Sequence, residues 1–434
     1  MSGNATSGFD RDRGEFARGA RTIVVLPDQG GAARSVEARL DETAGLAAAI
    51  GLDVVDRIAY RVRAARAGTL IGSGQVEALA ANVAMSEAGL VVFDAALTPI
   101  QQRNLETALG AKVIDRTGLI LEIFGERAAT AEGRLQVELA HLGYQAGRLV
   151  RSWTHLERQR GGFGFLGGPG ETQIEADRRL IRDRMARLRR ELAQVSRTRG
   201  LHRDRRQRAP WPVIALVGYT NAGKSTLFNR LTGADVMAAD LLFATLDPTL
   251  RQISLPGIDK AILSDTVGFV SDLPTQLVAA FKATLEEVAS ADLLIHVRDI
   301  AHPDTEAQRA DVEAVLGELG VTKATPRFEA WNKLDLLPEA EREALQAEAE
   351  RRGNVVCVSA LSGEGVVALQ TSVAARLTEG HRRYRLTLDA ADGAAMAWLH
   401  QHGEVVDSWT DELTTHADVR LAEADYQRFM QRPR

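Results

Sequence analysis

The sequence predicts an α/β protein whose largest part is a doubly wound, mostly parallel sheet over residues 211–379. Strand, loop and helix patterns alternate along this range, and a glycine-rich turn joins its first strand to a helix. Shorter alternations predict an N-terminal α/β domain over 21–130 and a small C-terminal α/β domain over 381–434. A helical hairpin is expected over 131–208, ahead of the large sheet.

Composition limits the classes to which the chain can belong. Of its 434 residues, 45% are hydrophobic and 26% are charged, and the net charge is −5, which is ordinary for a globular protein. No apolar run of about 18 residues occurs, so we expect no integral membrane segment and no secretory signal. We therefore expect a cytoplasmic protein, with peripheral association with a membrane left open. Residues 1–20 lack an apolar core and are predicted to form a disordered tail.

The single cysteine, Cys357, excludes an internal disulfide framework and a cysteine-based zinc site. The N-terminal domain is predicted from two apolar runs, over 22–26 and 89–94, that indicate buried strands. Residues 78–88 and 99–109 have the spacing of helices. Strands that alternate with helices favour a sheet with its own core.

The hairpin is predicted from two helical patterns, over 132–160 and 171–199, separated by the glycine cluster of 161–170. The second helix is strongly basic, because residues 171–208 hold thirteen arginines against six carboxylates in a chain that is acidic as a whole. Clustered arginines on one element are typical of phosphate binding. The candidates for contact with RNA are Arg178, Arg179, Arg182, Arg189 and Arg190.

The alternative for this basic helix is a solvated surface held by ion pairs four residues apart, such as Asp183 with Arg187. Many of the arginines occupy consecutive turns, so we expect that not all of them can face one RNA.

A phosphate-binding loop follows the first strand of the large sheet. Residues 213–217 form an apolar strand, and the next eight residues match the pattern G-x-x-x-x-G-K-S and open a helix. Backbone N–H groups of such a loop surround phosphate oxygens, and Lys224 is expected on the β- and γ-phosphates and Ser225 on Mg²⁺. The residues assigned to the nucleotide here are Gly218, Tyr219, Thr220, Asn221, Ala222, Gly223, Lys224, Ser225 and Thr226.

Guanine specificity is predicted from two later loops. Asp335, in the segment Asn332-Lys333-Leu334-Asp335, can accept hydrogen bonds from guanine N1–H and the 2-amino group, and Lys333 can lie against the base. Adenine has an acceptor at N1 and no 2-amino group, so it would leave this carboxylate unpaired. Further on, the segment Ser359-Ala360-Leu361 can supply a backbone N–H to guanine O6.

Two segments between these loops are candidates for nucleotide-dependent switches. In Asp265-Thr266-Val267-Gly268, the Asp265 carboxylate would hold Mg²⁺ through a water molecule, and the Gly268 N–H would sense the γ-phosphate. In Phe243-Ala244-Thr245-Leu246-Asp247, we expect Thr245 to be the second protein ligand of Mg²⁺. Thr249 is the alternative ligand, although it is better placed to open the next strand. Lys224, Thr245, Gly268 and Asn221 are the residues expected to act in hydrolysis.

Two residues bear on the rate of that hydrolysis. Phe269 follows Gly268, where many signalling GTPases place a glutamine that orients the attacking water, and phenylalanine cannot do this. Either another group does so, or hydrolysis is slow until a partner completes the site. Asn221 could help to bind a monovalent cation such as K⁺ near the phosphates, or could stabilise the loop, and the sequence leaves both readings open.

With these motifs, several further stretches resemble the HflX family of ribosome-associated GTPases. They are residues 68–77 (GTLIGSGQVE), 93–106, 113–121 (VIDRTGLIL), 153–159 (WTHLERQ) and 168–173 (GPGETQ), together with 243–249 and 265–269. The resemblance covers about 21–380. At the hairpin tip the chain departs from it, because 161–170 reads GGFGFLGGPG where many members carry a Thr-Arg pair before Gly-Pro-Gly. This puts a charged contact of the tip with RNA in doubt.

The resemblance implies a Mg²⁺-dependent GTPase that binds the large (50S) ribosomal subunit in its GTP state, through the N-terminal domain and the hairpin. It also implies a role in translation, in ribosome splitting or rescue, or in ribosome biogenesis. One alternative is a GTPase that acts on free RNA or a precursor subunit. Another is a nucleotide-dependent binding switch in which turnover matters little, which Phe269 favours. The expected oligomeric state is a monomer.

Overall fold

The computed structural model divides into two units, which are described separately below. The first is Met1–Leu192 with Asp240–Leu246 and Asp272–Phe281, and the second is the remainder. The structure describes residues 18–31, 34–159, 169–207, 211–234, 243, 249–271, 288–321, 325–379, 381–411 and 413–432. The predictions for most of the N-terminal tail, for most of the glycine-rich tip and for the segment 244–248 therefore lie outside the described residues.

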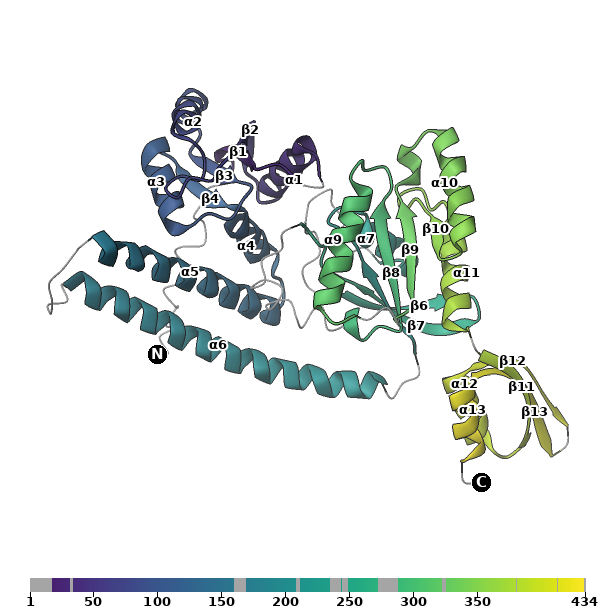
Figure 1. Cartoon of the computed structure of the whole chain (residues 1–434). Coiled ribbons are helices and arrows are strands. Elements are labelled where there is room, and N and C mark those ends of the chain that lie inside the picture. Colours follow the sequence, from purple (N-terminus) through teal and green to yellow (C-terminus); the bar gives the residue numbers. More distant parts are fainter. Residues whose placement is uncertain are drawn as a thin grey trace, which may run out of the picture. The chain divides into compact units, whose positions relative to one another are not determined.

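The first unit contains a four-stranded parallel sheet in the order β2-β1-β3-β4 (Figure 1). Its strands are β1 (Arg21–Asp28), β2 (Asp53–Arg61), β3 (Leu90–Phe93) and β4 (Lys112–Asp115). Apart from their end residues, β1 and β3 are buried on both faces, as the two apolar runs in the sequence predict. The predicted α/β fold of this part is therefore confirmed.

Helices cover both faces of this sheet. They are α1 (Val36–Ala49), α2 (Ser73–Ser86), α3 (Pro99–Leu109) and α4 (Arg116–Arg127). Side chains of α2 and α3 share one apolar core with alternate residues of β1, β3 and β4, while α1 and α4 contact each other and the sheet. Helix α3 has the predicted bounds, but α2 begins earlier than residue 78. The Gln75 side chain accepts a hydrogen bond from the Gly72 N–H at 2.9 Å. This cap allows α2 to begin at Ser73, before the predicted first residue.

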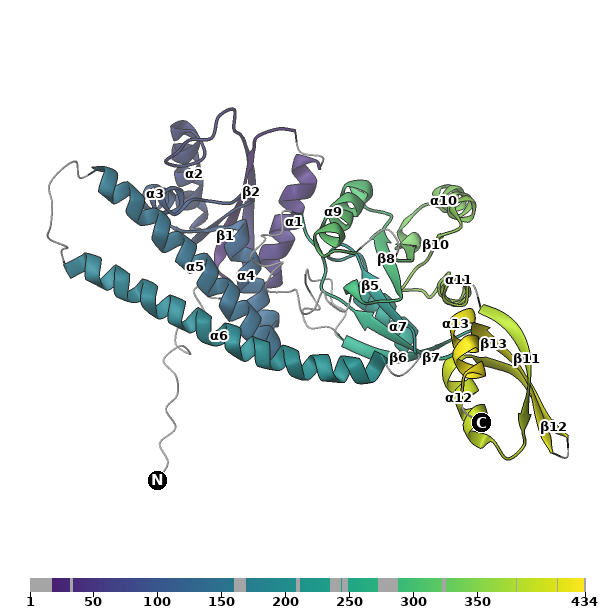
Figure 2. The ribbon, with the colours of Figure 1, turned by 60° about the horizontal axis from the view of Figure 1, so that its bottom comes forward.

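The hairpin consists of α5 (Ala131–Gln159) and α6 (Pro169–Gln207), which run side by side in Figure 2. Helix α6 is longer than predicted. Arg184 of α6 donates two hydrogen bonds to Glu138 of α5, at 2.7 and 3.0 Å, and Leu188 is fully buried. Arg184 therefore links the two helices of the hairpin. The pair of Asp183 with Arg187, the example given for the solvated alternative, does not form. Arg187 pairs instead with Glu191, also four residues away, so an ion pair of the kind that the alternative expects is present.

Asp115 joins the hairpin to the N-terminal sheet. This carboxylate is 2% exposed and accepts hydrogen bonds from the backbone N–H groups of Gly118 and Leu97, at 2.8 and 3.1 Å. From α5 it also accepts hydrogen bonds from the Tyr144 hydroxyl and the Arg148 guanidinium, both at 2.7 Å. Burial and the neighbouring Asp115 charge raise the pKa of Tyr144, which keeps its hydroxyl protonated as a donor. One buried charge thus caps α4 and fixes α5.

The second unit is built on a six-stranded sheet in the order β10-β9-β8-β5-β7-β6, in which only the β6–β7 pair is antiparallel. The strands are β5 (Val213–Val217), β6 (Thr249–Leu255), β7 (Ile258–Asp265), β8 (Leu293–Asp299), β9 (Arg327–Asn332) and β10 (Val355–Cys357). Helices α7 (Lys224–Thr232) and α11 (Val366–Leu377) share the core on one face. On the other face lie α9 (Thr305–Glu318) and α10 (Glu339–Arg352) (Figure 1). This is the doubly wound sheet that the sequence predicts.

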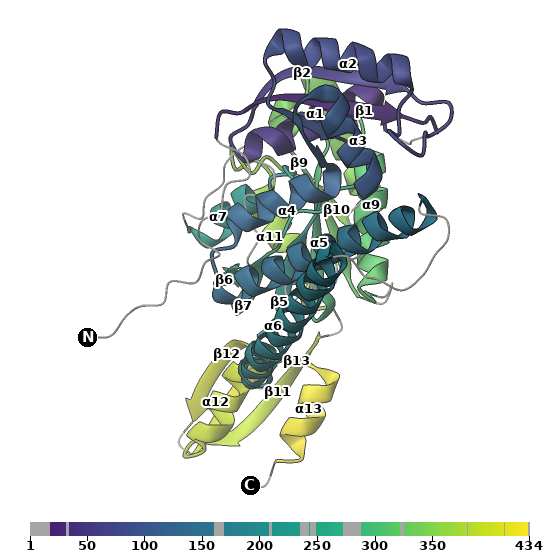
Figure 3. The same ribbon diagram turned by 90° about the vertical axis from the view of Figure 1, so that its left-hand side faces the viewer.

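The C-terminal residues form a three-stranded antiparallel sheet in the order β11-β13-β12. Its strands are β11 (His381–Asp389), β12 (Glu404–Asp411) and β13 (Thr414–Ala422). Helices α12 (Gly393–His402) and α13 (Glu423–Met430) pack on one side of it, as Figure 3 shows. No helix in the described part of the chain is long and apolar enough to cross a membrane.

Asp115→Ala should unfold the junction between the sheet and α5. The substitution removes the carboxylate that accepts hydrogen bonds from Arg148 and Tyr144. We therefore expect a loss of about 3–5 kcal/mol in the free energy of unfolding of this region. Tyr144→Phe, which removes one hydrogen bond, should cost only about 1 kcal/mol. Hydrogen exchange of the whole chain measures both effects, as faster exchange in α4 and α5 and unchanged exchange in β5 and α7. Unchanged protection of α5 in Asp115→Ala would contradict this role.

Candidate functional site

The phosphate-binding loop lies between β5 and α7, and two of its glycines are required by close contacts. Gly218 has φ +153°, and a Cβ atom there would lie 2.2 Å from the carbonyl oxygen of Val297. Gly223 has φ +91°, and a Cβ atom there would lie 2.1 Å from Nδ2 of Asn332. Asn221 also adopts a left-handed conformation, with φ +59°. Positions 218 and 223 therefore require glycine.

Lys224 is buried at the start of α7, and its ammonium group donates a hydrogen bond of 2.8 Å to the carbonyl oxygen of Tyr219. Burial lowers the pKa of Lys224 to about 8, and the charge of Asp265 opposes this shift. Gly268 lies against the same group, because a Cβ atom there would be 3.1 Å from Nζ of Lys224 and 2.8 Å from Cγ2 of Thr220. The structure thus brings Gly268 of the second switch candidate against the phosphate-binding loop.

Two candidate magnesium ligands meet at the end of β7. The Ser225 hydroxyl donates a hydrogen bond of 2.8 Å to Oδ2 of Asp265, whose side chain is fully buried. A hydroxyl and a carboxylate are hard oxygen donors of the kind that Mg²⁺ prefers, so this pair fits the ion. Among the described residues there is no group of three or more His, Cys, Asp or Glu side chains that could hold a metal ion.

The segment after β7 is hydrogen-bonded to the phosphate-binding loop. The Thr220 N–H donates to the carbonyl oxygen of Phe269 at 2.7 Å, and the Phe269 N–H donates to that of Gly218 at 3.1 Å. The Phe269 side chain is 1% exposed. The Ser271 N–H donates to the Tyr219 hydroxyl at 2.8 Å. The Phe269 ring is therefore a buried anchor, and its backbone connects the second switch candidate to the loop.

The two segments predicted to recognise the base meet at Asn332, at the end of β9. Its Nδ2 donates to the carbonyl oxygen of Ala222 at 2.8 Å, and its Oδ1 accepts from the Ala360 N–H at 2.9 Å. Oδ1 of Asp335 accepts a hydrogen bond of 2.6 Å from the Ser359 hydroxyl. Leu334, between them, is fully buried. The loop with Asp335, the loop with Ser359 and the phosphate-binding loop therefore form one connected site.

Four family models match this chain in order along its length. They are a GTP-binding GTPase N-terminal region at residues 37–125, a GTP-binding GTPase middle region at 127–206, a 50S ribosome-binding GTPase at 213–333 and an HflX C-terminal domain at 344–432. The chain is 52% identical to the GTPase HflX of Magnetococcus marinus over 385 residues, which are 89% of this chain and 88% of that one. The chain belongs to the GTPase HflX family.

A second relative agrees with this assignment. The GTPase HflX of Escherichia coli is 43% identical over 390 residues, which cover 90% of this chain and 91% of that one. Among solved structures, a GTP-binding protein from Sulfolobus solfataricus in complex with GDP is 22% identical and has a TM-score of 0.45, with 83% of this chain and 99% of that one covered. That likeness is too low to carry an argument. By family and by the fold of its second unit, the chain is a P-loop GTPase.

The remaining predicted residues are placed as follows. Lys333, at φ +66°, pairs through Nζ with Asp299 at 2.8 Å. Phe243 is buried and belongs to the first unit, where its ring lies edge-on to Phe124 with centroids 4.7 Å apart. Ala244, Thr245, Leu246 and Asp247 lie outside the described residues. Thr249 opens β6, as expected from the sequence.

The sequence did not identify Arg230 as part of the site. This residue of α7 donates a hydrogen bond of 3.2 Å from Nε to the carbonyl oxygen of Ala360, and another from its guanidinium to that of Leu361. These partners are 130 and 131 residues away along the chain, and no spacing pattern reveals such a contact.

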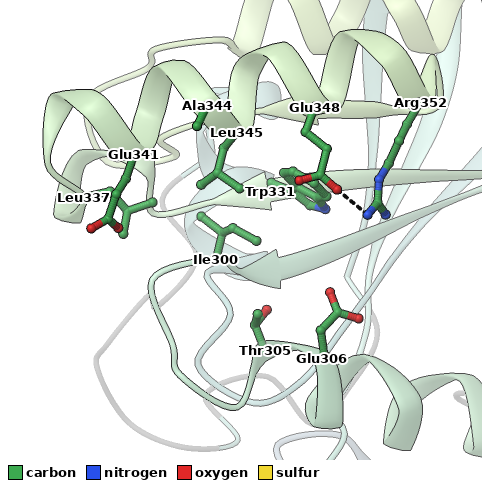
Figure 4. A pocket seen from close by; sticks show the side chains of 10 residues that line it. All are labelled: Ile300, Thr305, Glu306, Trp331, Leu337, Glu341, Ala344, Leu345, Glu348 and Arg352. Atoms are coloured by element: carbon green, nitrogen blue, oxygen red, sulfur yellow. Dashed lines mark hydrogen bonds and ion pairs between the residues drawn. The ribbon is translucent and has the colours of Figure 1, made fainter.

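A separate cavity of about 410 Å³ lies between the start of α9 and α10. Ile300, Trp331 and Leu345 line it together with Glu341 and Glu348 (Figure 4). Trp331 is the neighbour of Asn332, but none of the nucleotide-motif residues lines this cavity. It is therefore not the nucleotide site.

Nucleotide binding should take up a proton above neutral pH. In the nucleotide-free protein the Lys224 ammonium titrates with a pKa of about 8, and phosphates would stabilise its charged form. We expect an uptake of about half a proton per GDP at pH 8, falling to about a tenth at pH 7, and an affinity that declines as the pH rises above 8. Calorimetry in two buffers of different ionisation enthalpy measures this uptake. Equal heats in the two buffers at pH 8 would show that Lys224 is charged before the nucleotide arrives.

Proposed function

We propose that this chain binds GTP at the site formed by the phosphate-binding loop and the loops after β7, β9 and β10, and converts GTP to GDP and phosphate there. The observation that carries the proposal is the pair of hydrogen bonds made by Asn332, because they join the loop for the phosphates to the loop for the base. Asp335 would read guanine N1–H and the 2-amino group, and a backbone N–H of 359–361 would read O6. The nucleotide residues are those assigned from the sequence.

Ser225 and Asp265, the latter through water, would hold Mg²⁺ with Thr245. The ion supplies neutralisation of the charge on the β- and γ-phosphate oxygens. Lys224 would place its ammonium on the same oxygens, and Gly268 would offer its N–H to the γ-phosphate. Since the Phe269 ring is buried and cannot orient water, we propose that hydrolysis is slow in the isolated protein. Asn221 would help to hold K⁺ beside the phosphates.

We further propose that the chain works as a cytoplasmic monomer on the large ribosomal subunit, in ribosome splitting or rescue, or in biogenesis. The description of the model matched at 213–333 supports a 50S partner. The arrangement of α6 supports contact with RNA. At about 100° per residue, the five candidate arginines at 178, 179, 182, 189 and 190 fall within about 120° of the helix circumference.

This arginine stripe is distinct from the arginines that hold the hairpin together. Arg179, Arg182, Arg189 and Arg190 are exposed and Arg178 is partly exposed, whereas Arg184 points to Glu138. The expectation that not all of the thirteen arginines can face one RNA still allows these five to do so. A stripe of this width can follow one phosphate backbone, in which each neutralised phosphate releases counterions.

The proposal is tested by GTP hydrolysis with and without purified large ribosomal subunits, in matched K⁺ and Na⁺ buffers. We expect strong stimulation by the subunits, a higher rate in K⁺ and co-sedimentation that requires a GTP analogue. Lys224→Ala should abolish all three, because it removes the charge on the β- and γ-phosphates. Subunit binding that Lys224→Ala leaves intact would contradict gating by GTP. Stimulation by free RNA alone would favour a role on RNA or precursor subunits.

The arginine stripe should determine how subunit binding depends on salt. Arg182→Gln should weaken binding of the GTP-analogue form and reduce the slope of log affinity against log salt by about one. Arg187→Gln is the matched control, because Arg187 lies outside the stripe and pairs with Glu191. Titrations of labelled protein with subunits at several K⁺ concentrations measure the slope. An equal change in the control would mean that only total charge matters.

A further inference from the structure

Arg230 connects the phosphate-binding helix to the loop that follows β10. It lies in the last turn of α7, whose first residue is Lys224. Its Nε is 3.2 Å from the carbonyl oxygen of Ala360, and its guanidinium also donates to the carbonyl oxygen of Leu361. A Cβ atom at Gly363 would lie 3.7 Å from Cζ of Arg230, so the loop also wraps the guanidinium from a second side.

Two hydrogen bonds to consecutive carbonyl groups fix the orientation of two peptide planes. In a trans peptide the N–H points away from the C=O. By holding the carbonyl of Ala360, Arg230 therefore turns the N–H of Leu361 in the opposite direction. The N–H of Ser362, next along the chain, donates to the Ser359 hydroxyl at 3.1 Å. That hydroxyl donates in turn to Asp335, so the same loop orients the carboxylate expected to read the base.

The backbone N–H groups of Ser359 and Ala360 already have hydrogen-bond partners within the protein. The Ser359 N–H donates to the carbonyl oxygen of Glu364 at 2.9 Å, and the Ala360 N–H donates to Oδ1 of Asn332 at 2.9 Å. The direction of the Leu361 N–H therefore bears directly on recognition of an oxygen at position 6 of the base. The Leu361 side chain itself is 73% exposed and contributes little to holding the loop.

We propose that Arg230 is a positioning residue for guanine recognition, which holds the loop 359–361 so that its backbone can donate to guanine O6. This inference rests on the proposed guanine site. It adds a link by which the phosphate-binding helix sets the geometry of the base loop. A guanidinium is required for this, because its donors lie in a rigid plane, whereas the three N–H groups of a lysine sit on one atom.

A purely electrostatic role of Arg230 at the helix end must be distinguished from this positioning role. A cation in the last turn of a helix also favours the helix dipole, and lysine would serve that purpose equally well. Arg230→Lys keeps the charge at the end of α7 and removes the planar pair of donors. Arg376→Lys is a matched control, because Arg376 is a partly exposed arginine near the end of α11 that pairs with Glu379.

The experiment compares the affinities of the full-length proteins for GDP, 6-thio-GDP and IDP. Compared with GDP, 6-thio-GDP keeps N1–H and the 2-amino group but replaces O6 by a poor acceptor, while IDP keeps O6 and lacks only the 2-amino group. In the unmodified protein we expect GDP to bind up to about tenfold more tightly than 6-thio-GDP, as the loss of one hydrogen bond implies. In Arg230→Lys this ratio should approach one, while the ratio of GDP to IDP stays unchanged. Arg376→Lys should change neither ratio.

The alternative outcomes are distinct. If Arg230→Lys keeps the 6-thio-GDP ratio, or loses both ratios together, Arg230 is only a structural residue and the inference is wrong. If the unmodified protein does not prefer GDP to IDP, the proposed reading of guanine by Asp335 fails, and the inference falls with it. If Arg230→Lys folds poorly in thermal unfolding, Arg230→Gln provides the second variant, with the same expected change in the two ratios.

Discussion

The side-chain amide of Asn332 is the interaction on which the nucleotide site depends. It is 2% exposed and satisfies two buried backbone groups, the carbonyl of Ala222 and the N–H of Ala360. An amide offers a donor on one atom and an acceptor on the other. Aspartate would place an oxygen against the Ala222 carbonyl, and an apolar residue would leave two backbone groups without a partner, at about 1–3 kcal/mol each. Gly223 obeys the same constraint, because only glycine leaves room for this amide.

On the side that faces the segment after β7, the phosphate-binding loop is also held by hydrogen bonds. Backbone hydrogen bonds between Gly218, Thr220 and Phe269 continue the pairing of β5 with β7 into the loop. Gly268 packs against Thr220 and Lys224. The loop is therefore fixed between β9 on one side and the segment after β7 on the other. Backbone N–H groups that are oriented before a phosphate arrives need little reorganisation on binding, and this lowers the entropic cost of association.

Most of the fold could be predicted from the sequence, because its signals are local. Buried strands such as β1 and β3 are short apolar runs, and α3 begins with a capping box at Thr98 and ends before a left-handed glycine, Gly110. The motif loops can be recognised in the sequence because a turn that approaches phosphate closely admits few residue types. The start of α2 was missed because its cap is a glycine held by Gln75. A glycine cap resembles an ordinary turn.

The contacts that could not be predicted join residues far apart in the chain. Arg230 reaches Ala360, Tyr144 and Arg148 reach Asp115, and the Phe269 backbone pairs with the phosphate-binding loop. Each depends on where the sheet and helices place a long side chain or a peptide group, which no spacing in the sequence encodes. For arginine this limit is general. The basic segment contains thirteen arginines, but only the structure shows that Arg184 binds Glu138 of the other hairpin helix while the arginines of the stripe are solvent-accessible.

The proposed gating by the nucleotide rests on Thr245, which lies in a short stretch of sequence between two residues that the structure describes, Phe243 and Thr249. Phe243 is buried within the first unit against Phe124 of α4, and Thr249 opens β6 of the second unit. Only five residues separate them, and Thr245 is one of these. If Thr245 contacts the nucleotide only in the triphosphate state, as proposed, the free energy of that contact favours the conformation in which it forms. Such a difference is what a population shift requires, and it needs no further relay of side chains.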